Sequence, residues 1–230
     1  MKNLYILFAF LILASPTFAQ DYTKARKKMV IDQIAKRGIN HRATLDAMRK
    51  VERHLFVPPA YMGMAYDDGP MPIGYGQTIS QPYIVAYMTE IIKPKKDDKI
   101  LEIGTGSGYQ AAILAEIVDT VYTIEIVSEL AKTASDRLQK LGYDNVEVIS
   151  GDGYYGLEEH APFDAIVVTA AAEHIPPSLI RQLKDGGKMV IPVGSPFLVQ
   201  TLMLVEKKKG KVSTSSLMPV RFVPFTRSQE

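Results

Sequence analysis

The fold of this 230-residue chain is decided by one stretch, Lys99-Ile100-Leu101-Glu102-Ile103-Gly104-Thr105-Gly106-Ser107-Gly108-Tyr109-Gln110. A short apolar run breaks into alternating glycines and continues into the apolar residues 111–118. This pattern predicts a strand, a glycine turn and a helix. Glycines in such a turn let the backbone approach a ligand closely, and the helix presents free N–H groups at its start. The stretch is therefore typical of a nucleotide-binding α/β fold.

The spacing of the glycines separates two classes of nucleotide-binding protein. The dinucleotide fingerprint G-x-G-x-x-G, begun at Gly104, requires a glycine at position 109, where this chain has Tyr109. This departure weakens the prediction of an NAD-dependent oxidoreductase. Spacing of the form E-x-G-x-G-x-G instead resembles the first motif of methyltransferases that use S-adenosylmethionine (AdoMet). A glycine turn without any ligand is the structural alternative.

Length and composition exclude several other classes of protein. A chain of 230 residues suits one α/β catalytic unit with appendages, and its net charge of +2 is spread along the sequence. The basic cluster 207–211 lies between two strand-like runs and is interpreted as a solvated hairpin tip, so we expect no nucleic-acid partner. Without cysteine, the chain has no disulfide, thiolate metal site or cysteine nucleophile. We expect a monomer without a metal site.

The N-terminus has the pattern of a secretory signal. Residues 1–3 give a positive start, 4–14 form an apolar run too short to span a bilayer comfortably, and 17–19 end in a small residue at a cleavage point. We therefore interpret residues 1–20 as a signal peptide and predict an exported, periplasmic protein without stable membrane insertion after cleavage. If the segment is not cleaved, the protein is membrane-anchored or cytoplasmic.

Residues 21–95 are predicted to form N-terminal helices and a substrate loop that pack on the core. Asp21 is a suitable N-cap for a helix that Gly38 ends, and Asn40 is a suitable N-cap for the next. Prolines and glycines crowd residues 56–76 among tyrosines and methionines. So many breakers forbid a long helix or a central strand, while the aromatic residues argue against disorder. We predict an ordered functional loop.

Ser80 stands out in the segment after this loop. Pro82 follows it in what reads as the first turn of a helix over 84–92, so Ser80 is predicted to be the N-cap. A cap without further function is one interpretation. The other is a binding site, because a serine hydroxyl and the first N–H groups of a helix together favour a carboxylate.

Residues 96–230 are predicted to form the catalytic core, in which strands and helices alternate. The strand over 120–126 ends near Glu125, an acidic residue about 20 positions beyond the first glycine, where nucleotide-binding folds hold ribose hydroxyls. Ser128 is the expected cap of the helix that follows. Asp152 lies in a turn after the strand over 145–149, on the ligand side of an open sheet. Its alternative role is that of a turn former.

The remaining elements complete a Rossmann-like, doubly wound and mostly parallel sheet. A continuous apolar run predicts a buried strand over 163–169, followed by a helix over 177–184 and a strand over 188–193. The runs 198–205 and 212–218 predict an antiparallel hairpin at the C-terminus. No Asn/Asp-Pro-Pro-Tyr/Phe motif follows Thr169, which argues against methyl transfer to amino groups.

Several motifs together point to a narrower group of enzymes. They read MPIGYGQTISQP at 71–82, LEIGTGSGYQ at 101–110, GDG at 151–153, FDAIVVTAA at 163–171, QLKDGG at 182–187, IPVG at 191–194 and VRFVP at 220–224. Over nearly all of residues 22–226 the chain resembles the protein-L-isoaspartate O-methyltransferase family. The glycine motif is shared by many methyltransferases, whereas T-I-S-x-P and R-F-V-P are much narrower.

The resemblance implies a class I methyltransferase fold and transfer of a methyl group from AdoMet to the free carboxylate of L-isoaspartyl residues in damaged proteins or peptides. The ester then collapses to a succinimide, which begins repair. Ser80 is expected to orient the carboxylate, with Thr78 and Gln81 contributing to substrate binding. The expected cofactor-binding residues are Glu102, Gly104, Thr105, Gly106, Gly108, Glu125, Asp152 and Gly153. A small-molecule methyltransferase and a non-catalytic exported binding protein are the alternative functions.

Overall fold

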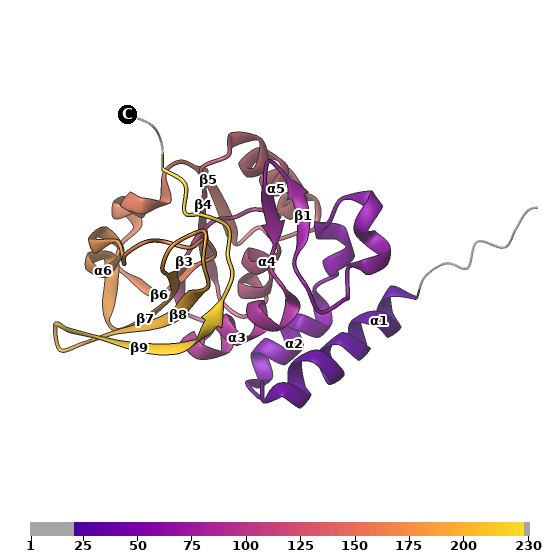
Figure 1. Ribbon diagram of the computed structural model, residues 1–230, viewed down its shortest axis with the longest axis horizontal. Helices are drawn as coiled ribbons and strands as arrows, with labels where there is room; N and C mark the ends of the chain where they lie inside the picture. The colour runs from indigo at the N-terminus through magenta and orange to yellow at the C-terminus, as the bar shows by residue number, and fades with distance from the viewer. Residues whose placement is uncertain (1–20, 228–230) are drawn as a thin grey trace, which may run out of the picture.

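Seven strands form the central sheet in the computed structural model, which describes residues 21–227 (Figure 1). Their spatial order is β5-β4-β3-β6-β7-β8-β9. The strands are β3 (Lys99–Ile103), β4 (Thr120–Glu125), β5 (Val146–Ser150), β6 (Phe163–Val168), β7 (Leu183–Val193), β8 (Gln200–Lys208) and β9 (Lys211–Val220). Strands β3 to β7 pair in parallel, and β8 and β9 are antiparallel. The predicted mostly parallel sheet with a C-terminal antiparallel hairpin is confirmed.

Each central strand is buried on both faces, which explains its continuous apolar sequence. In β3, Ile100 packs in one hydrophobic cluster and Leu101 packs in another on the opposite face. The first cluster includes helices α2 (Arg42–Lys50), α3 (Pro82–Ile92) and α4 (Tyr109–Ala115). The second includes Leu179 of α6 (Pro177–Gln182). Helix α5 (Ser128–Lys140) packs on β4 and β5 at one end of the sheet.

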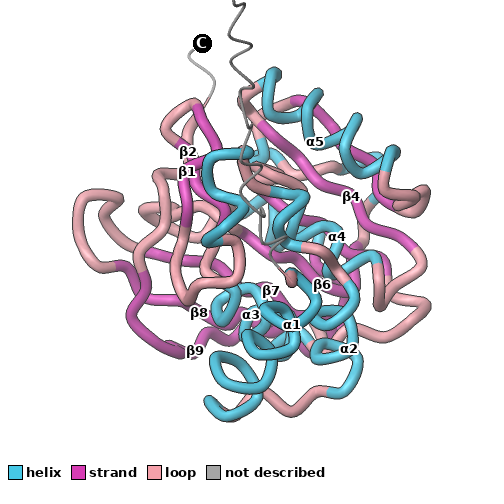
Figure 2. Tube along the Cα trace, turned by 90° about the vertical axis from the view of Figure 1, so that its right-hand side faces the viewer, coloured by secondary structure: helices cyan, strands magenta, loops and turns pink. Residues whose placement is uncertain are grey.

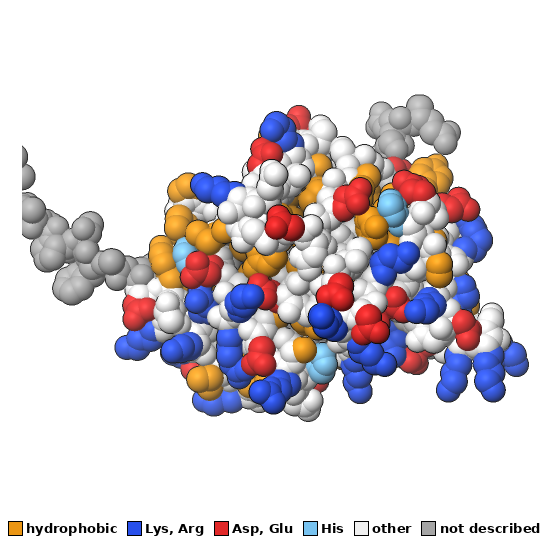
Figure 3. Space-filling model, turned by 180° about the vertical axis from the view of Figure 1, so that it is seen from behind, with side chains coloured by type: hydrophobic (Ala, Val, Ile, Leu, Met, Phe, Trp, Pro, Cys, Tyr) orange, Lys and Arg blue, Asp and Glu red, His pale blue; other side chains and the backbone are white. Residues whose placement is uncertain are grey.

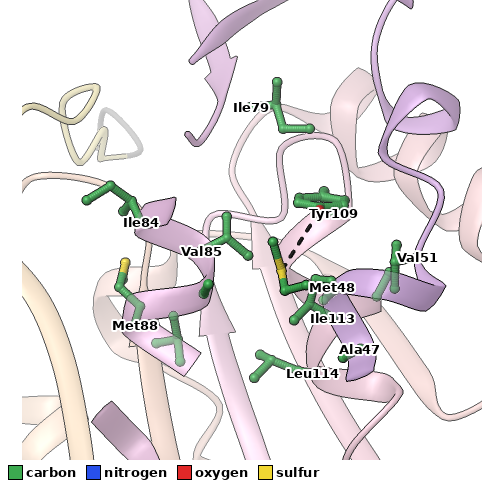
Figure 4. Close-up of a cluster of buried hydrophobic side chains, with 14 of the residues drawn as sticks. Ala47, Met48, Val51, Ile79, Ile84, Val85, Met88, Tyr109, Ile113 and Leu114 are labelled. Atoms are coloured by element: carbon green, nitrogen blue, oxygen red, sulfur yellow. Dashed lines mark hydrogen bonds between the residues drawn. The ribbon is translucent and has the colours of Figure 1, made fainter. Parts of the chain in front are cut away.

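Figure 4 shows how the N-terminal helices share their core with the helix that follows the glycine turn. Met48 of α2, Val85 of α3 and Tyr109 of α4 point into one cluster. The Tyr109 hydroxyl donates to the Met48 sulfur at 3.9 Å. The tyrosine that replaces the third glycine of a dinucleotide fingerprint is therefore a core residue, and it fixes α4 against α2.

Helix α1 (Tyr22–Lys28) begins the described chain and runs on as a π-helix (Met29–Ile34) and a 3₁₀ turn (Ala35–Arg37). The side chain of Asp21 accepts from the Lys24 N–H at 3.0 Å, so the predicted N-cap is confirmed. Gly38 ends this helical segment with a φ of 99°, in the left-handed region that favours glycine.

The N-caps predicted at Asn40 and Ser128 are wrong. His41 occupies the cap position of α2, and the Glu90 carboxylate of α3 accepts from the Asn40 and His41 N–H groups. This tertiary contact replaces the expected local cap. At α5 the cap position belongs to Val127, whose N–H donates to Glu125.

The breaker-rich segment is ordered, as predicted. The segment 56–76 begins where the 3₁₀ helix Arg53–Phe56 ends, and it contains the 3₁₀ helix Pro59–Met64 and β1 (Met71–Gly74), which forms a hairpin with β2 (Gln77–Ile79). The hairpin turn has a positive φ at both central residues, 53° at Tyr75 and 71° at Gly76. A turn of this type matches the twist of the two strands, and it directs the chain from β2 to the start of α3.

The strands of the C-terminal hairpin differ from their predicted bounds: β8 covers Gln200–Lys208 instead of 198–205, and β9 covers Lys211–Val220 instead of 212–218.

The helix predicted over 177–184 is shorter than expected. Helix α6 ends at Gln182, two residues earlier than expected, because Leu183 already pairs with Phe163 of β6. The ammonium group of Lys207 donates to the carbonyls of Ile180 and Leu183 at 3.2 and 2.8 Å. One lysine of the basic cluster is therefore engaged at the C-terminus of α6, where a cation is favourable.

Figure 2, turned by 90° from Figure 1, shows α1 and α2 lying together below α4, away from the β1–β2 hairpin. On the face shown in Figure 3, basic and acidic side chains are interspersed. No helix within residues 21–227 combines the length and apolarity needed to cross a membrane. The predicted signal segment, 1–20, lies outside the described residues.

Candidate active site

The glycine turn lies where the sheet reverses its strand order, since β4 and β5 extend to one side of β3 and β6 and β7 to the other. Open α/β sheets bind ligands at this switch point. Gly104 has a φ of 97°, and a Cβ there would lie 2.5 Å from the Thr169 hydroxyl oxygen. That hydroxyl donates to the Gly104 carbonyl at 2.7 Å. Only glycine fits at this position.

A hollow at this turn gathers four of the predicted cofactor residues. It is lined by Gly104, Gly106, Glu125, Gly153, Thr78 and Gln77, by the apolar residues Ile103, Ile124 and Ile126, and by the segment 223–226. A Cβ on Gly153 would overlap the Cγ2 methyl of Ile103. The backbone at Gly153 therefore packs directly against Ile103, and both residues line the hollow.

Glu125 holds the glycine turn in place. Its carboxylate accepts from the Gly106 N–H at 2.8 Å and from the Val127 N–H at 3.0 Å. Because the two bonds fall on different oxygens, each oxygen keeps a lone pair for a further donor. Glu125 is thus both a support of the turn and a free acceptor at the end of β4.

Four predicted cofactor residues lie outside the lining of this hollow: Glu102 and Thr105 line a smaller hollow beside it, and Gly108 and Asp152 line neither. Gly108 packs against α5, where a Cβ would lie 3.1 Å from Leu138. The side chain of Asp152 accepts from the Tyr154 N–H at 3.0 Å and from Arg227 at 2.9 Å. Asp152 therefore shapes the turn that leads to Gly153 and ties it to the C-terminal segment.

Glu102 is fully buried beside the hollow. Burial, together with the charge of Glu125, raises the pKa of its carboxyl to about 8, although the hydroxyl of Thr123, which donates at 2.5 Å, acts in the opposite direction. Among residues 21–227 nothing donates to the Glu102 Oε1 atom or to the Gln110 Oε1 atom. Both residues line a small hollow with Thr105 and Ser80. Two buried oxygens without partners suit a ligand that carries N–H groups, and a positively charged group bound there would favour the ionised, accepting form of Glu102.

Ser80 opens into a second and larger cavity of about 410 Å³. The lining includes Thr78, Gln81 and the cations Arg37 and Arg221, but among the described residues it holds no Asp or Glu. Tyr83 and Ile84, in the first turn of α3, also face this cavity. Their backbone N–H groups lie in the first turn of the helix and have no acceptor within it. The cavity therefore favours an anion.

The predicted capping role of Ser80 is wrong. Gln81 takes the N-cap position of α3, with an extended ψ of 137°, and no side chain caps the helix. The reason is Pro82, which forces the preceding residue out of the helical region. The Ser80 hydroxyl is consequently not used by the helix. Ser80 remains part of the cavity lining.

Gln81 contributes through its place at the helix start, because its side chain is already engaged. The Gln81 amide donates to the Asp68 carboxylate at 2.8 Å, and Arg37 pairs with the same carboxylate at 2.9 Å. The Arg37 guanidinium also stacks 3.5 Å above the Tyr83 ring. This network fixes the part of the cavity lining at the start of α3.

The two cavities adjoin. Thr78, Thr169 and Val223 line both the hollow at the glycine turn and the cavity at Ser80. A group bound against the glycines can therefore meet a group bound at the start of α3. The site has the arrangement of a transferase with separate donor and acceptor subsites.

Comparison with known proteins decides the family. The sequence profile described as protein-L-isoaspartate(D-aspartate) O-methyltransferase matches residues 24–230. The chain belongs to this family. A protein-L-isoaspartate O-methyltransferase of Nitrosospira multiformis is 60% identical over 91% of this chain and 90% of its own length. Another, from Opitutus terrae, is 55% identical with 100% of both chains covered.

Solved structures of protein-L-isoaspartate O-methyltransferases share the fold. One is 28% identical, with a TM-score of 0.80 over 86% of this chain and 65% of its own. A second, from Plasmodium falciparum, was described as a putative member in complex with S-adenosyl-L-homocysteine. It is 26% identical, with a TM-score of 0.77 over 88% of this chain and 99% of its own.

Sequence reasoning missed part of the family site. The segment 223–226 lines the hollow, and its backbone pairs with Ala171 through bonds of 2.8 and 2.9 Å. Figure 1 shows this segment running from β9 up across the front of the molecule. The narrow R-F-V-P motif was the available signal. Gln110 and Thr169 were also missed, because their positions depend on contacts between elements: Gln110 of α4 donates to Thr89 of α3, and Thr169 donates to Gly104 after the neighbouring strand β3.

Proposed function

We propose that this chain methylates the free α-carboxylate of L-isoaspartyl residues in proteins and peptides, with AdoMet as the methyl donor. The observation that carries the proposal is the adjoining pair of cavities, joined at Thr78, Thr169 and Val223. One cavity is built on the glycine turn, and the other is lined by two arginines, a free serine hydroxyl and a helix start. The family relationship supports the same reaction.

The residues at the glycine turn fit AdoMet. Glu125 would accept from the ribose hydroxyls, and the apolar side chains of Ile103, Ile124 and Ile126 would flank the adenine. The unpaired acceptors of Glu102 and Gln110 would receive the ammonium protons of its methionine part. When bound there, AdoMet supplies a methyl group activated by its sulfonium charge.

The chain's own contribution is to hold and orient the substrate carboxylate. A free α-carboxyl has a pKa of about 3.5, so it is ionised at neutral pH and needs no general base. The Ser80 hydroxyl and the N–H groups of Tyr83 and Ile84 would donate to one oxygen and leave the other free to accept the methyl group. Orientation of this kind contributes roughly 7–11 kcal/mol.

Arg37 and Arg221 would assist in a less specific way. Both line the cavity, but Asp68 already balances the charge of Arg37 at 2.9 Å, so Arg221 would supply most of the positive field. That field favours entry of a carboxylate and disfavours a neutral amide at the same place. This would help to distinguish the isoaspartyl residue from asparagine.

The organisation of the whole chain is proposed on the same basis. We infer a signal peptide over 1–20, N-terminal helices with the substrate loop over 21–95 and a catalytic core over 96–230, acting as a periplasmic monomer. Export requires a supply of AdoMet outside the cytoplasm. Cell fractionation with an antibody tests this part: a mature form in the periplasm supports it, and an uncleaved cytoplasmic form contradicts it.

The methylation assay uses labelled AdoMet and paired peptides that differ only in carrying isoaspartate or aspartate. We expect base-labile methyl ester on the isoaspartyl peptide alone. If AdoMet binds and neither peptide is labelled, the proposed acceptor is wrong, and the chain is a methyltransferase of a small molecule. If AdoMet does not bind, the chain is a binding protein that keeps the fold.

A further inference from the structure

The loop between β7 and β8, residues 194–199, presents the most exposed apolar surface of the described chain. Phe197 is 90% exposed, Leu198 is 68% exposed and Val199 is 53% exposed. Single apolar residues on a surface are normal, but three in succession at the edge of a functional cavity indicate a contact surface. No part of the reaction described above uses Phe197 or Leu198.

The loop is continuous with the substrate cavity. Val199 lines the cavity that contains Ser80, together with Arg221 and Phe222. At its other end, Pro196 lines a neighbouring hollow of about 290 Å³ with Tyr154 and Phe225. Phe197 and Leu198 thus stand on the rim between two depressions. A polypeptide that places one residue at Ser80 has this rim beside it as a contact surface.

The loop is held in one conformation by Gln200, which is only 2% exposed. The Gln200 amide donates to the carbonyls of Ser195 and Leu198 at 3.0 and 2.9 Å. Its oxygen accepts from the Phe222 N–H at 2.9 Å, which ties the loop to the segment after β9. The apolar tip is therefore preorganised, and binding to it costs little conformational entropy.

We propose that Phe197 and Leu198 form a subsite for an apolar side chain that flanks the isoaspartyl residue of a polypeptide substrate. This inference rests on the proposed function of the Ser80 cavity. It makes the enzyme selective for damage in unfolded segments rich in apolar residues. Such segments expose large side chains that folded proteins bury, so the rim selects chains in need of repair.

The test compares two short isoaspartyl peptides, one with leucine and the other with serine on both sides of the isoaspartate. The measured quantity is kcat/KM for the wild type and for the double variant Phe197→Ser/Leu198→Ser. We expect the wild type to prefer the leucine peptide. The double variant should lose about tenfold on that peptide and little on the serine peptide. Val212→Ser, at an apolar residue 43% exposed on β9, is the matched control.

The outcomes separate this inference from the proposed function. If the wild type methylates neither peptide, the proposed function fails first. If both peptides are methylated and the double variant lowers kcat/KM equally for both peptides, or for neither, the proposed subsite is wrong. If the double variant methylates both peptides like the wild type but no longer binds phosphatidylglycerol vesicles, the loop is a membrane contact. If its kinetics are unchanged but light scattering shows that a wild-type dimer has become a monomer, the loop contacts a second copy of the chain.

Discussion

The guanidinium of Arg227 pairs with the carboxylate of Asp152 at 2.9 Å, and it stacks 3.6 Å above the ring of Tyr154. These two contacts join the end of the described chain to the turn after β5. Between them and β9, residues 223–226 cover the hollow at the glycine turn. The pair therefore holds the C-terminal segment closed against the hollow at the glycine turn, where AdoMet is proposed to bind.

Replacing Arg227 should loosen this closure. We expect Arg227→Ala to weaken AdoMet binding by about fivefold, because a half-exposed ion pair and a cation–π contact each contribute on the order of 1 kcal/mol. Titration calorimetry measures the change in Kd. Arg42→Ala is the control, since Arg42 lies on α2 and its side chain is 95% exposed. An unchanged Kd in the Arg227 variant would contradict the closure.

Glu102 should make the AdoMet-free protein less stable as the pH rises. Burial raises the pKa of its carboxyl from 4.5 to about 8, so the folded state keeps a proton that the unfolded state loses. The contribution of Glu102 to the free energy of unfolding is fully present below pH 4.5. It is lost as the pH rises towards 8, by at most about 1.4 kcal/mol per pH unit.

Glu102→Gln removes this titration and keeps an oxygen for Thr123. We expect the variant to gain at least about 1 kcal/mol over the wild type between pH 5 and pH 8. Chemical denaturation at both pH values measures the difference, with the exposed Glu147→Gln as the control. Parallel pH profiles for the variant and the wild type would show that Glu102 does not titrate in this range.

Gly153 should not tolerate a side chain. In Gly153→Ala the new methyl overlaps Ile103, which must shift within the hollow. Overpacking of this kind costs about 1–3 kcal/mol, and we expect both a lower Tm and weaker AdoMet binding. Gly69→Ala is the matched control, because a Cβ there meets nothing within 4 Å. If both variants behave like the wild type, the close backbone approach at Gly153 is not required.

The sequence was informative wherever the structure depends on neighbours along the chain. The strand, glycine turn and helix around Gly104 follow from local apolar and glycine patterns, and they were predicted correctly. The same holds for Asp21 and Gly38 at the two ends of the first helical segment. The prediction at Ser80 failed although its signal was local, since Pro82 moves the cap to Gln81.

Other features depend on residues far apart in the sequence and have no local signal. Arg227 and Asp152 are 75 positions apart, and Asn40 and Glu90 are 50 positions apart. The burial of Glu102 was not evident either, because its partner Thr123 belongs to the neighbouring strand. Periodicity defines the elements of this fold, but the contacts between elements determine how the site is supported.

The central claim, that Ser80 orients the substrate carboxylate, is tested most directly by comparing Ser80→Ala with the wild type on an isoaspartyl peptide. Removing one hydrogen bond to a charged group should lower kcat/KM by roughly 10- to 100-fold, with AdoMet affinity nearly unchanged. Ser213→Ala, an exposed serine on β9, is the control. Wild-type kcat/KM in Ser80→Ala, with the same preference for isoaspartate over aspartate, would contradict the claim.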